Sequence, residues 1–127
     1  MSQAYLEHAN ISVSNPDKSA KRLCDLFNWT VRWSGPSMDD GYTVHVGGSN
    51  SYVALYSCGK IHNRNKLDHT QLANLNHIAV AVSDLEKTEE IAKKLGLKPF
   101  NFREYNPGRS FYLVDDDGLE IEVVCYQ

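Results

Sequence analysis

The chain consists of two halves that repeat one pattern. The first half opens with the segment LEHANISVS at residues 6–14, and the second opens with LNHIAVAVS at residues 75–83. Each segment has a histidine at its third position, His8 in the first and His77 in the second. Because each copy of an internal repeat folds as the same supersecondary unit, we predict two copies of one module with their histidines at equivalent positions.

A helix and then three strands are predicted after the histidine segment of each half. The triplet Asn15-Pro16-Asp17 is typical of a helix start, and Ser83 with Glu86 three residues later forms a capping-box pattern. Asn28 and Gly96 are residue types that end helices in the left-handed conformation. Turn residues separate the predicted strands, which are residues 30–34, 42–46 and 51–57 in the first half and 98–104, 110–114 and 119–125 in the second.

Each half therefore has the order β-α-β-β-β. The predicted fold class is α+β, with two repeated modules forming a cupped, mixed β-sheet and the helices outside. The first module covers residues 1–57, a linker covers 58–74, and the second module covers 75–127. We expect one compact domain, which a chain of 127 residues can form. A single module leaves an apolar face exposed, so we also predict a homodimer.

Composition excludes several classes of partner. The net charge is −3 and the chain has no run of Lys or Arg, which argues against nucleic acid and anionic membranes. No apolar stretch is long enough to span a membrane, and no signal peptide is recognisable. The three cysteines, Cys24, Cys58 and Cys125, lack metal-site spacing and fit a reducing compartment. We therefore expect a cytoplasmic protein whose partner is a small molecule.

The alternation of side chains along strands brings three residues to one kind of surface. His8 and His77 lie opposite the apolar residues that should pack on the helices, and so do Glu120 and Glu122 near the end of the chain. If the sheets curve toward each other, His8, His77 and Glu122 converge. Two imidazoles and one carboxylate suit Zn(II), Ni(II), Fe(II) or Mn(II) and leave coordination positions open to a substrate.

The sequence resembles the vicinal oxygen chelate superfamily, which includes glyoxalase I, fosfomycin resistance proteins, bleomycin resistance proteins and extradiol dioxygenases. The resemblance rests on LEHANISVS, on LNHIAVAVSDLEK and on the closing motif FYLVDDDGLEIEVV. It implies metal ligands from the first and last strand of each module, and His8, His77 and Glu122 match three of them. The fourth position holds Ala54, and Asp116 stands where the family's closing turn usually has proline.

The resemblance implies a divalent-metal enzyme whose substrate chelates the metal through vicinal oxygens. Lyase or isomerase chemistry of the glyoxalase kind is the first hypothesis, because extradiol enzymes usually have longer chains. The set of two histidines and one glutamate beside Ala54 favours the alternative of extradiol-like ring cleavage. A third hypothesis is a metal-free binding protein of the bleomycin resistance kind, with a cavity lined by Tyr52, Tyr56 and Trp33. The substrate, the metal, and the choice between a site within one chain and a site across a dimer stay open.

Further residues are candidates for supporting roles. Proton transfer needs a titratable group beside the substrate, and the candidates are Glu120, Tyr52, Tyr56 and His45. Substrate anions are commonly held by arginine, and the candidates for substrate binding are Arg32, Arg103, Arg109 and Trp33. His62 and His69 lie in the predicted linker and are interpreted as surface residues.

Overall fold

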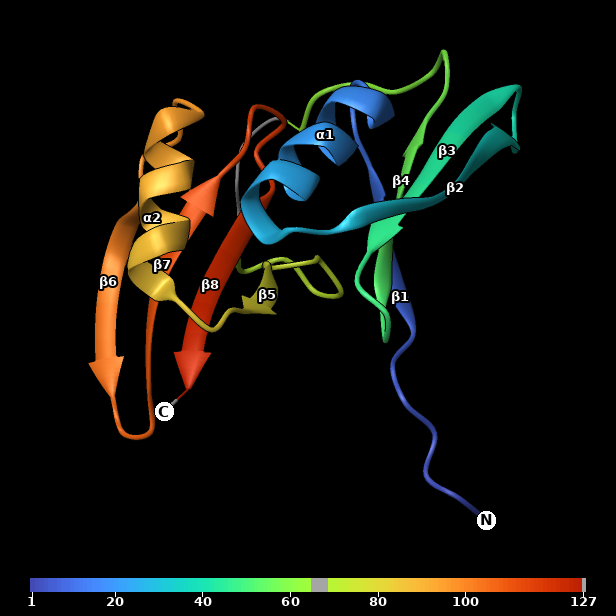
Figure 1. Ribbon diagram of the computed structural model, residues 1–127. Coiled ribbons are helices and arrows are strands. Elements are labelled where there is room, and N and C mark those ends of the chain that lie inside the picture. Colours follow the sequence, from blue (N-terminus) through green and yellow to red (C-terminus); the bar gives the residue numbers. More distant parts are fainter. Residues whose placement is uncertain (65–68, 127) are drawn as a thin grey trace. The chain divides into compact units, whose positions relative to one another are not determined.

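The structure, a computed structural model, describes residues 1–64 and 69–126 (Figure 1). Residues 65–68 of the predicted linker, and Gln127, lie outside the described residues. The chain divides into two compact units, Met1–His62 and Asn63–Gln127, and each is described by itself. The predicted bounds of the modules and linker stay a prediction.

The first unit contains one helix and a four-stranded sheet. Its elements are β1 (His8–Ser12), α1 (Pro16–Phe27), β2 (Thr30–Ser37), β3 (Gly41–Gly47) and β4 (Tyr52–Ser57). The strand order is β1-β4-β3-β2, in which β1 and β4 are parallel and the other pairs are antiparallel. Helix α1 packs against this sheet, mainly on β3 and β4.

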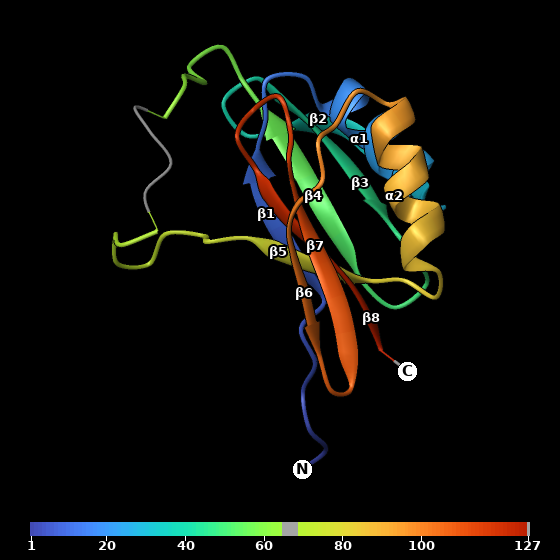
Figure 2. The ribbon, with the colours of Figure 1, turned by 90° about the vertical axis from the view of Figure 1, so that its left-hand side faces the viewer.

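The second unit repeats this plan. Its elements are β5 (Ile78–Ala81), α2 (Leu85–Lys94), β6 (Phe100–Tyr105), β7 (Gly108–Val114) and β8 (Glu120–Tyr126). The strand order is β5-β8-β7-β6, again with one parallel pair, β5 and β8. Figure 2 shows α2 beside the strands of this sheet. The predicted α+β class with two β-α-β-β-β modules is confirmed.

The helix ends follow the local sequence, with one correction. Asn15 caps α1 by accepting a hydrogen bond from the backbone N–H of Lys18, and Asn28 ends the helix at φ 58°. The predicted capping box at the start of α2 is wrong, because the cap is Asp84, which accepts from the N–H of Lys87. The carboxylate of Glu86 instead binds Arg109.

The core of each unit lies on the face of its sheet that carries apolar side chains. Side chains under 2% exposed include Val44, Val46 and Leu55 in the first unit and Phe111, Leu113 and Val123 in the second. They alternate along β3, β4, β7 and β8 with more polar residues, which therefore lie on the opposite face. No helix in the described part of the chain is long and apolar enough to cross a membrane.

Candidate functional site

The second unit brings together two of the three predicted metal ligands. The Nε2 atom of His77 lies 3.2 Å from Oε1 of Glu122. His77 directly precedes β5, and Glu122 lies in β8 opposite Ala79 of β5, so the parallel pairing of these strands produces the contact. The side chains are 29% and 17% exposed, respectively, so the pair is accessible without lying fully in water.

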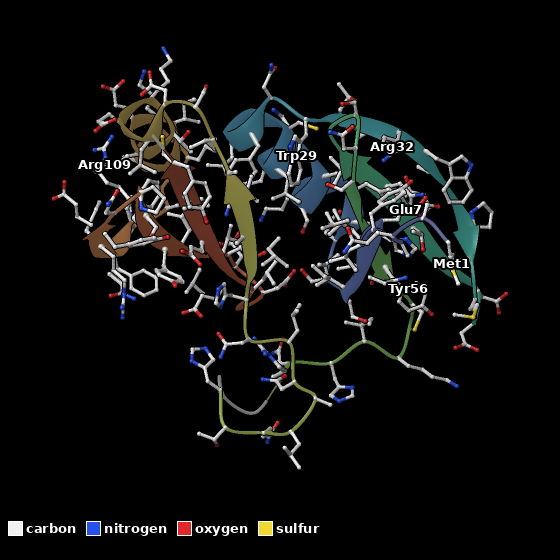
Figure 3. All side chains as sticks on the ribbon, turned by 90° about the horizontal axis from the view of Figure 1, so that it is seen from below. Met1, Glu7, Trp29, Arg32, Tyr56 and Arg109 are labelled. Atoms are coloured by element: carbon white, nitrogen blue, oxygen red, sulfur yellow. The ribbon has the colours of Figure 1, made fainter. Side chains whose placement is uncertain are left out.

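The second ring nitrogen of each histidine is held by the residue immediately before it. Nδ1 of His77 lies 2.7 Å from Oδ1 of Asn76, and Nδ1 of His8 lies 2.9 Å from Oε1 of Glu7. Both oxygens only accept hydrogen bonds, so Nδ1 donates in both rings. Nε2 of His77 faces the Glu122 carboxylate, which also only accepts, so in this structure Nε2 of His77 is a donor too. Figure 3 labels Glu7 in the first unit. Such a partner orients a histidine for metal binding through the other nitrogen.

The geometry of the His77–Glu122 pair fits a divalent metal. Two donor atoms about 2.1 Å from one ion, at angles between octahedral and tetrahedral, lie about 3.0–3.4 Å apart. The observed 3.2 Å falls in this range. Within residues 1–64 and 69–126, no three His, Cys, Asp or Glu side chains gather as one metal-binding group. The second unit therefore offers a two-donor site.

Tyr112 and Glu120 extend the polar surface around this pair. The Tyr112 ring meets His77 edge-on at 5.4 Å, and Tyr112 lies opposite Glu122 in the β7–β8 pairing. Burial, together with the charge and hydrogen bond of Glu122, raises the pKa of the Tyr112 hydroxyl. Glu120 is buried, and its Oε2 lies 3.2 Å from Nε2 of His69. Glu120 thus lies two residues before Glu122 in β8, with its carboxylate in contact with the His69 imidazole.

The first unit has alanine where the second has Glu122. Ala54 lies opposite Asn10 in the β1–β4 pairing, just as Glu122 lies opposite Ala79 in the β5–β8 pairing. This register makes Ala54 the counterpart of Glu122, in agreement with the fourth ligand position predicted for it from the sequence. Ala54 is 2% exposed, and as an alanine it offers no carboxylate at this point.

A row of aromatic rings, the aromatic file, lies on the same face of the first unit's sheet as Ala54. The rings of His8 and Tyr52 stack with centroids 4.8 Å apart and planes at 12°, and His45 stacks on Tyr52 at 4.7 Å. Trp33 continues the file at 5.1 Å from His45, and the Arg32 guanidinium carbon lies 4.6 Å from the centre of the Tyr52 ring. Burial, followed by the charges of His8 and Arg32, lowers the pKa of His45. His45 is therefore a neutral ring at neutral pH.

The remaining candidates divide between the two faces. Arg103 lies opposite Ser110 on β7, and its positive charge partly offsets the rise in the pKa of Tyr112, so it belongs to the face of Glu122. Arg109 lies on the other face of β7, where its guanidinium binds the Glu86 carboxylate beside α2 (Figure 3). The structure thus brings Arg103, but not Arg109, toward the His77–Glu122 pair.

Tyr56 has a structural partner in the first unit. Its hydroxyl donates to the carbonyl of Met38 at 2.8 Å (Figure 3). The hydrogen bond with Cys58, followed by desolvation, raises the pKa of Tyr56 to about 12. A hydroxyl with this pKa stays protonated near neutral pH, so Tyr56 can donate a hydrogen bond but is a poor general base.

Two features of these surfaces were not predicted from the sequence. The contact of His69 with Glu120 joins a residue outside the helices and strands to β8, and no periodicity signals such a pairing. The second feature is an irregularity in β2, where the register with β3 shifts between Val31 and Trp33. Gly35 and Pro36, which begin five residues after Thr30, would have indicated at most an irregular or edge strand.

Known proteins show the same fold. The family model of the Glyoxalase/Bleomycin resistance protein/Dioxygenase superfamily matches residues 5–123. A glyoxylase/bleomycin resistance protein/dioxygenase domain from Frankia sp. EAN1pec superposes with a TM-score of 0.80 at 18% identity, covering 99% of this chain and 100% of that one. No curated protein matches the chain in sequence.

Two of the similar structures are proteins with named activities. The fosfomycin resistance protein FosX from Listeria monocytogenes, in complex with Mn(II) and sulfate, has a TM-score of 0.76 at 18% identity and covers 99% of this chain and 95% of its own. The trypanothione-dependent glyoxalase I of Leishmania major has a TM-score of 0.76 at 21% identity, covering 97% and 87%. At these identities the structures show the fold alone. With the family model matching nearly its whole length, the chain belongs to the Glyoxalase/Bleomycin resistance protein/Dioxygenase superfamily.

Proposed function

We propose that the protein is a divalent-metal-dependent enzyme acting on a small molecule, with lyase or isomerase chemistry of the glyoxalase kind. His77 and Glu122 supply two ligands, and His8 supplies the third, from the same chain or from a second copy. The observation that carries the proposal is the 3.2 Å separation of the His77 and Glu122 donor atoms, with Nδ1 of His77 held by Asn76.

The matched setting of His8 supports its place in the ligand set. Glu7 holds its Nδ1 as Asn76 holds that of His77, so Nε2 is the coordinating nitrogen in both imidazoles. At His77 a metal would replace the proton that Nε2 shares with Glu122. One protein of similar structure, FosX from Listeria monocytogenes, is known in complex with Mn(II). The donor set of two imidazoles and one carboxylate is compatible with Mn(II), Fe(II), Ni(II) and Zn(II).

A metal bound there would act as a Lewis acid toward a substrate oxygen. The protein's own groups would position the ligands and move protons. Asn76 fixes the orientation of His77, and the Tyr112 hydroxyl hydrogen-bonds Glu122. Glu120 is the candidate proton acceptor, with His69 as its partner at 3.2 Å. Arg103, on the same face, is the candidate for holding an anionic group of the substrate.

Ala54 supports ring cleavage as the second candidate function. Two histidines and one carboxylate with open positions form the ligand set of non-haem Fe(II) oxygenases. The missing fourth protein ligand at Ala54 is consistent with that set. The identity of the bound metal separates the candidates, since iron would direct assays to catechol cleavage.

The test is the metal content of purified protein, measured by mass spectrometry before and after reconstitution. We expect close to one equivalent per chain in the wild type. Glu122→Gln and His77→Gln remove a donor while keeping the size of the side chain, and each should lower metal affinity more than a hundredfold, beyond the 10- to 100-fold effect of losing an outer-shell partner. His8→Gln tests the third ligand.

Two surface variants serve as matched controls. Glu89→Gln changes a carboxylate of α2 that pairs with Lys93, and His62→Gln changes an exposed histidine whose Nδ1 contacts the carbonyl of Lys60. Both should bind metal like the wild type. Absence of metal after reconstitution would reject the proposal and favour a metal-free binding protein. Full metal retention in His8→Gln would remove His8 from the ligand set.

A homodimer in the cytoplasm completes the proposal. All three cysteines, which lie in the described part of the chain, are free thiols, and free thiols persist in a reducing compartment. Light scattering of the purified protein tests the dimer, and a molecular mass near that of one 14.3 kDa chain would reject it.

A further inference from the structure

An irregularity in β2 turns Arg32 toward the aromatic file. In the pairing with β3, Val31 lies opposite Val46 and Trp33 lies opposite His45, so Arg32 is the additional residue of a bulge. In a regular strand, Arg32 and Trp33 would point to opposite faces. A bulge re-aims side chains in this way and is common beside functional sites. Here Arg32 contacts Tyr52 while Trp33 contacts His45.

Trp33 stands at the open end of the file. It is 48% exposed, although its ring touches His45. The indole lies against Gly35, where an added Cβ would come within 2.7 Å of the ring carbon Cζ2 of Trp33. Because Gly35 has no side chain, the indole can lie along the strand. The Trp33 indole thus presents a large, exposed aromatic surface that a ligand can contact.

The guanidinium of Arg32 is able to bind an anion. Across residues 1–64 and 69–126 the contact of its guanidinium is with the Tyr52 ring, and no carboxylate pairs with it. Arg109 in the other unit, by contrast, is bound to Glu86 on two nitrogens. A guanidinium offers a planar fork of donors that matches a carboxylate.

We propose that Arg32 and Trp33 form a binding site for a planar aromatic carboxylate. The aromatic ring of the ligand stacks on the exposed Trp33 indole, and its carboxylate accepts hydrogen bonds from the Arg32 guanidinium. The Arg32 guanidinium lies over Tyr52 and the Trp33 indole lies against His45, and the Tyr52 and His45 rings stack on each other, so one small ligand reaches both. The bulge in β2, which puts a cation and an aromatic ring side by side on one face, carries this assignment.

The site belongs to the first unit and needs no metal. As the substrate class of the enzyme, an aromatic carboxylate rests on the proposed function. As a binding site, it depends only on β2 and its neighbours. Measuring binding in protein that lacks metal therefore separates failure of this proposal from failure of the metal site.

The test uses the indole N–H signals of Trp29 and Trp33 in a ¹H–¹⁵N NMR spectrum of protein treated with a chelator. 2-Naphthoate is titrated, and Trp33→Phe assigns the signals. We expect the Trp33 signal to shift saturably, while the signal of Trp29, which packs on Phe27, stays in place.

Variants and ligand analogues define the two halves of the site. Arg32→Gln should weaken binding about tenfold, as expected for loss of a charge-assisted hydrogen bond, and Arg32→Lys should weaken it less. Lys21→Gln removes the same charge from α1, where Lys21 pairs with Asp25, and should bind like the wild type. Cyclohexanecarboxylate, which lacks the flat ring, and 2-naphthalenemethanol, which lacks the carboxylate, should bind more weakly.

Several results would overturn the proposal. A Trp33 signal that 2-naphthoate does not move rejects the site. Equal weakening in Arg32→Gln and Lys21→Gln shows that only net charge attracts the ligand. Cyclohexanecarboxylate binding as tightly as 2-naphthoate rejects stacking on Trp33, and 2-naphthalenemethanol doing so rejects the role of the Arg32 guanidinium.

Discussion

The two units share a backbone plan but differ in the side chains on the polar face of the sheet. In both, the first and last strands pair in parallel with the same register, so Ala54 and Glu122 occupy matching positions. Crossing the sheet at this level, the first unit has Asn10, Ala54, His45 and Trp33, and the second has Ala79, Glu122, Tyr112 and Phe100. The two units are therefore alike on the buried faces of their sheets, and they differ in the side chains on the polar faces.

The largest expected difference between the units lies in their cores. Phe111 and Val44 occupy matching positions, opposite Val123 and Leu55 respectively, and both are at most 1% exposed. Phe111→Ala should lower the free energy of unfolding by about 3–5 kcal/mol. Val44→Ala removes two methyl groups and should cost about 2 kcal/mol. Urea denaturation followed by circular dichroism measures both.

The shape of the unfolding transition sharpens this prediction. If the units unfold together, each variant shifts one transition. If they unfold separately, Phe111→Ala shifts only the transition of the second unit, and Val44→Ala only that of the first. Equal losses in the two variants would contradict the premise that the second unit's larger side chain contributes more to the core.

The residues before the two histidines allow a second comparison. Asn76→Ala removes the acceptor that holds Nδ1 of His77, and Glu7→Ala removes the one that holds His8. If both histidines bind the metal, each variant should lower metal affinity 10- to 100-fold, the usual effect of losing an outer-shell partner. Isothermal titration with Mn(II) measures the change, and a loss confined to Asn76→Ala would mean that His8 is not a ligand.

The fold could be predicted from the sequence because the signals for it are local and repeated. Helix caps, turn residues and the alternation along strands placed every strand and helix, and Asp84 replaced Ser83 as a cap only because its carboxylate reaches the N–H of Lys87. Residue alternation also placed Glu122 on the face of His77. Alternation fails where register slips, and for this reason Arg32 could not be assigned to a face before the bulge in β2 was known. The contact of His69 with Glu120 depends on the path of a loop, which no period encodes.

The smallest expected effect is on the titration of His45, the counterpart of Tyr112 in the first unit. Burial is the main cause of its lowered pKa, with His8 and Arg32 adding to it. Arg32→Gln removes one of the smaller causes, so the pKa of His45 should rise partway toward the ordinary value of about 6.5. An NMR titration of the imidazole in metal-free protein measures this change, and Lys21→Gln, which removes a charge from α1, should leave the pKa where it is.

The sign of the linked change in stability follows from proton binding. A histidine whose pKa is lowered by folding binds fewer protons in the folded state than in the unfolded state, so its contribution to stability falls as the pH drops through about 6.5. Arg32→Gln should reduce this loss. The free energy of unfolding of the variant, relative to that of the wild type, should therefore be higher at pH 5 than at pH 8. A difference independent of pH would mean that Arg32 acts on the first unit through packing on Tyr52 rather than through the charge it presents to His45.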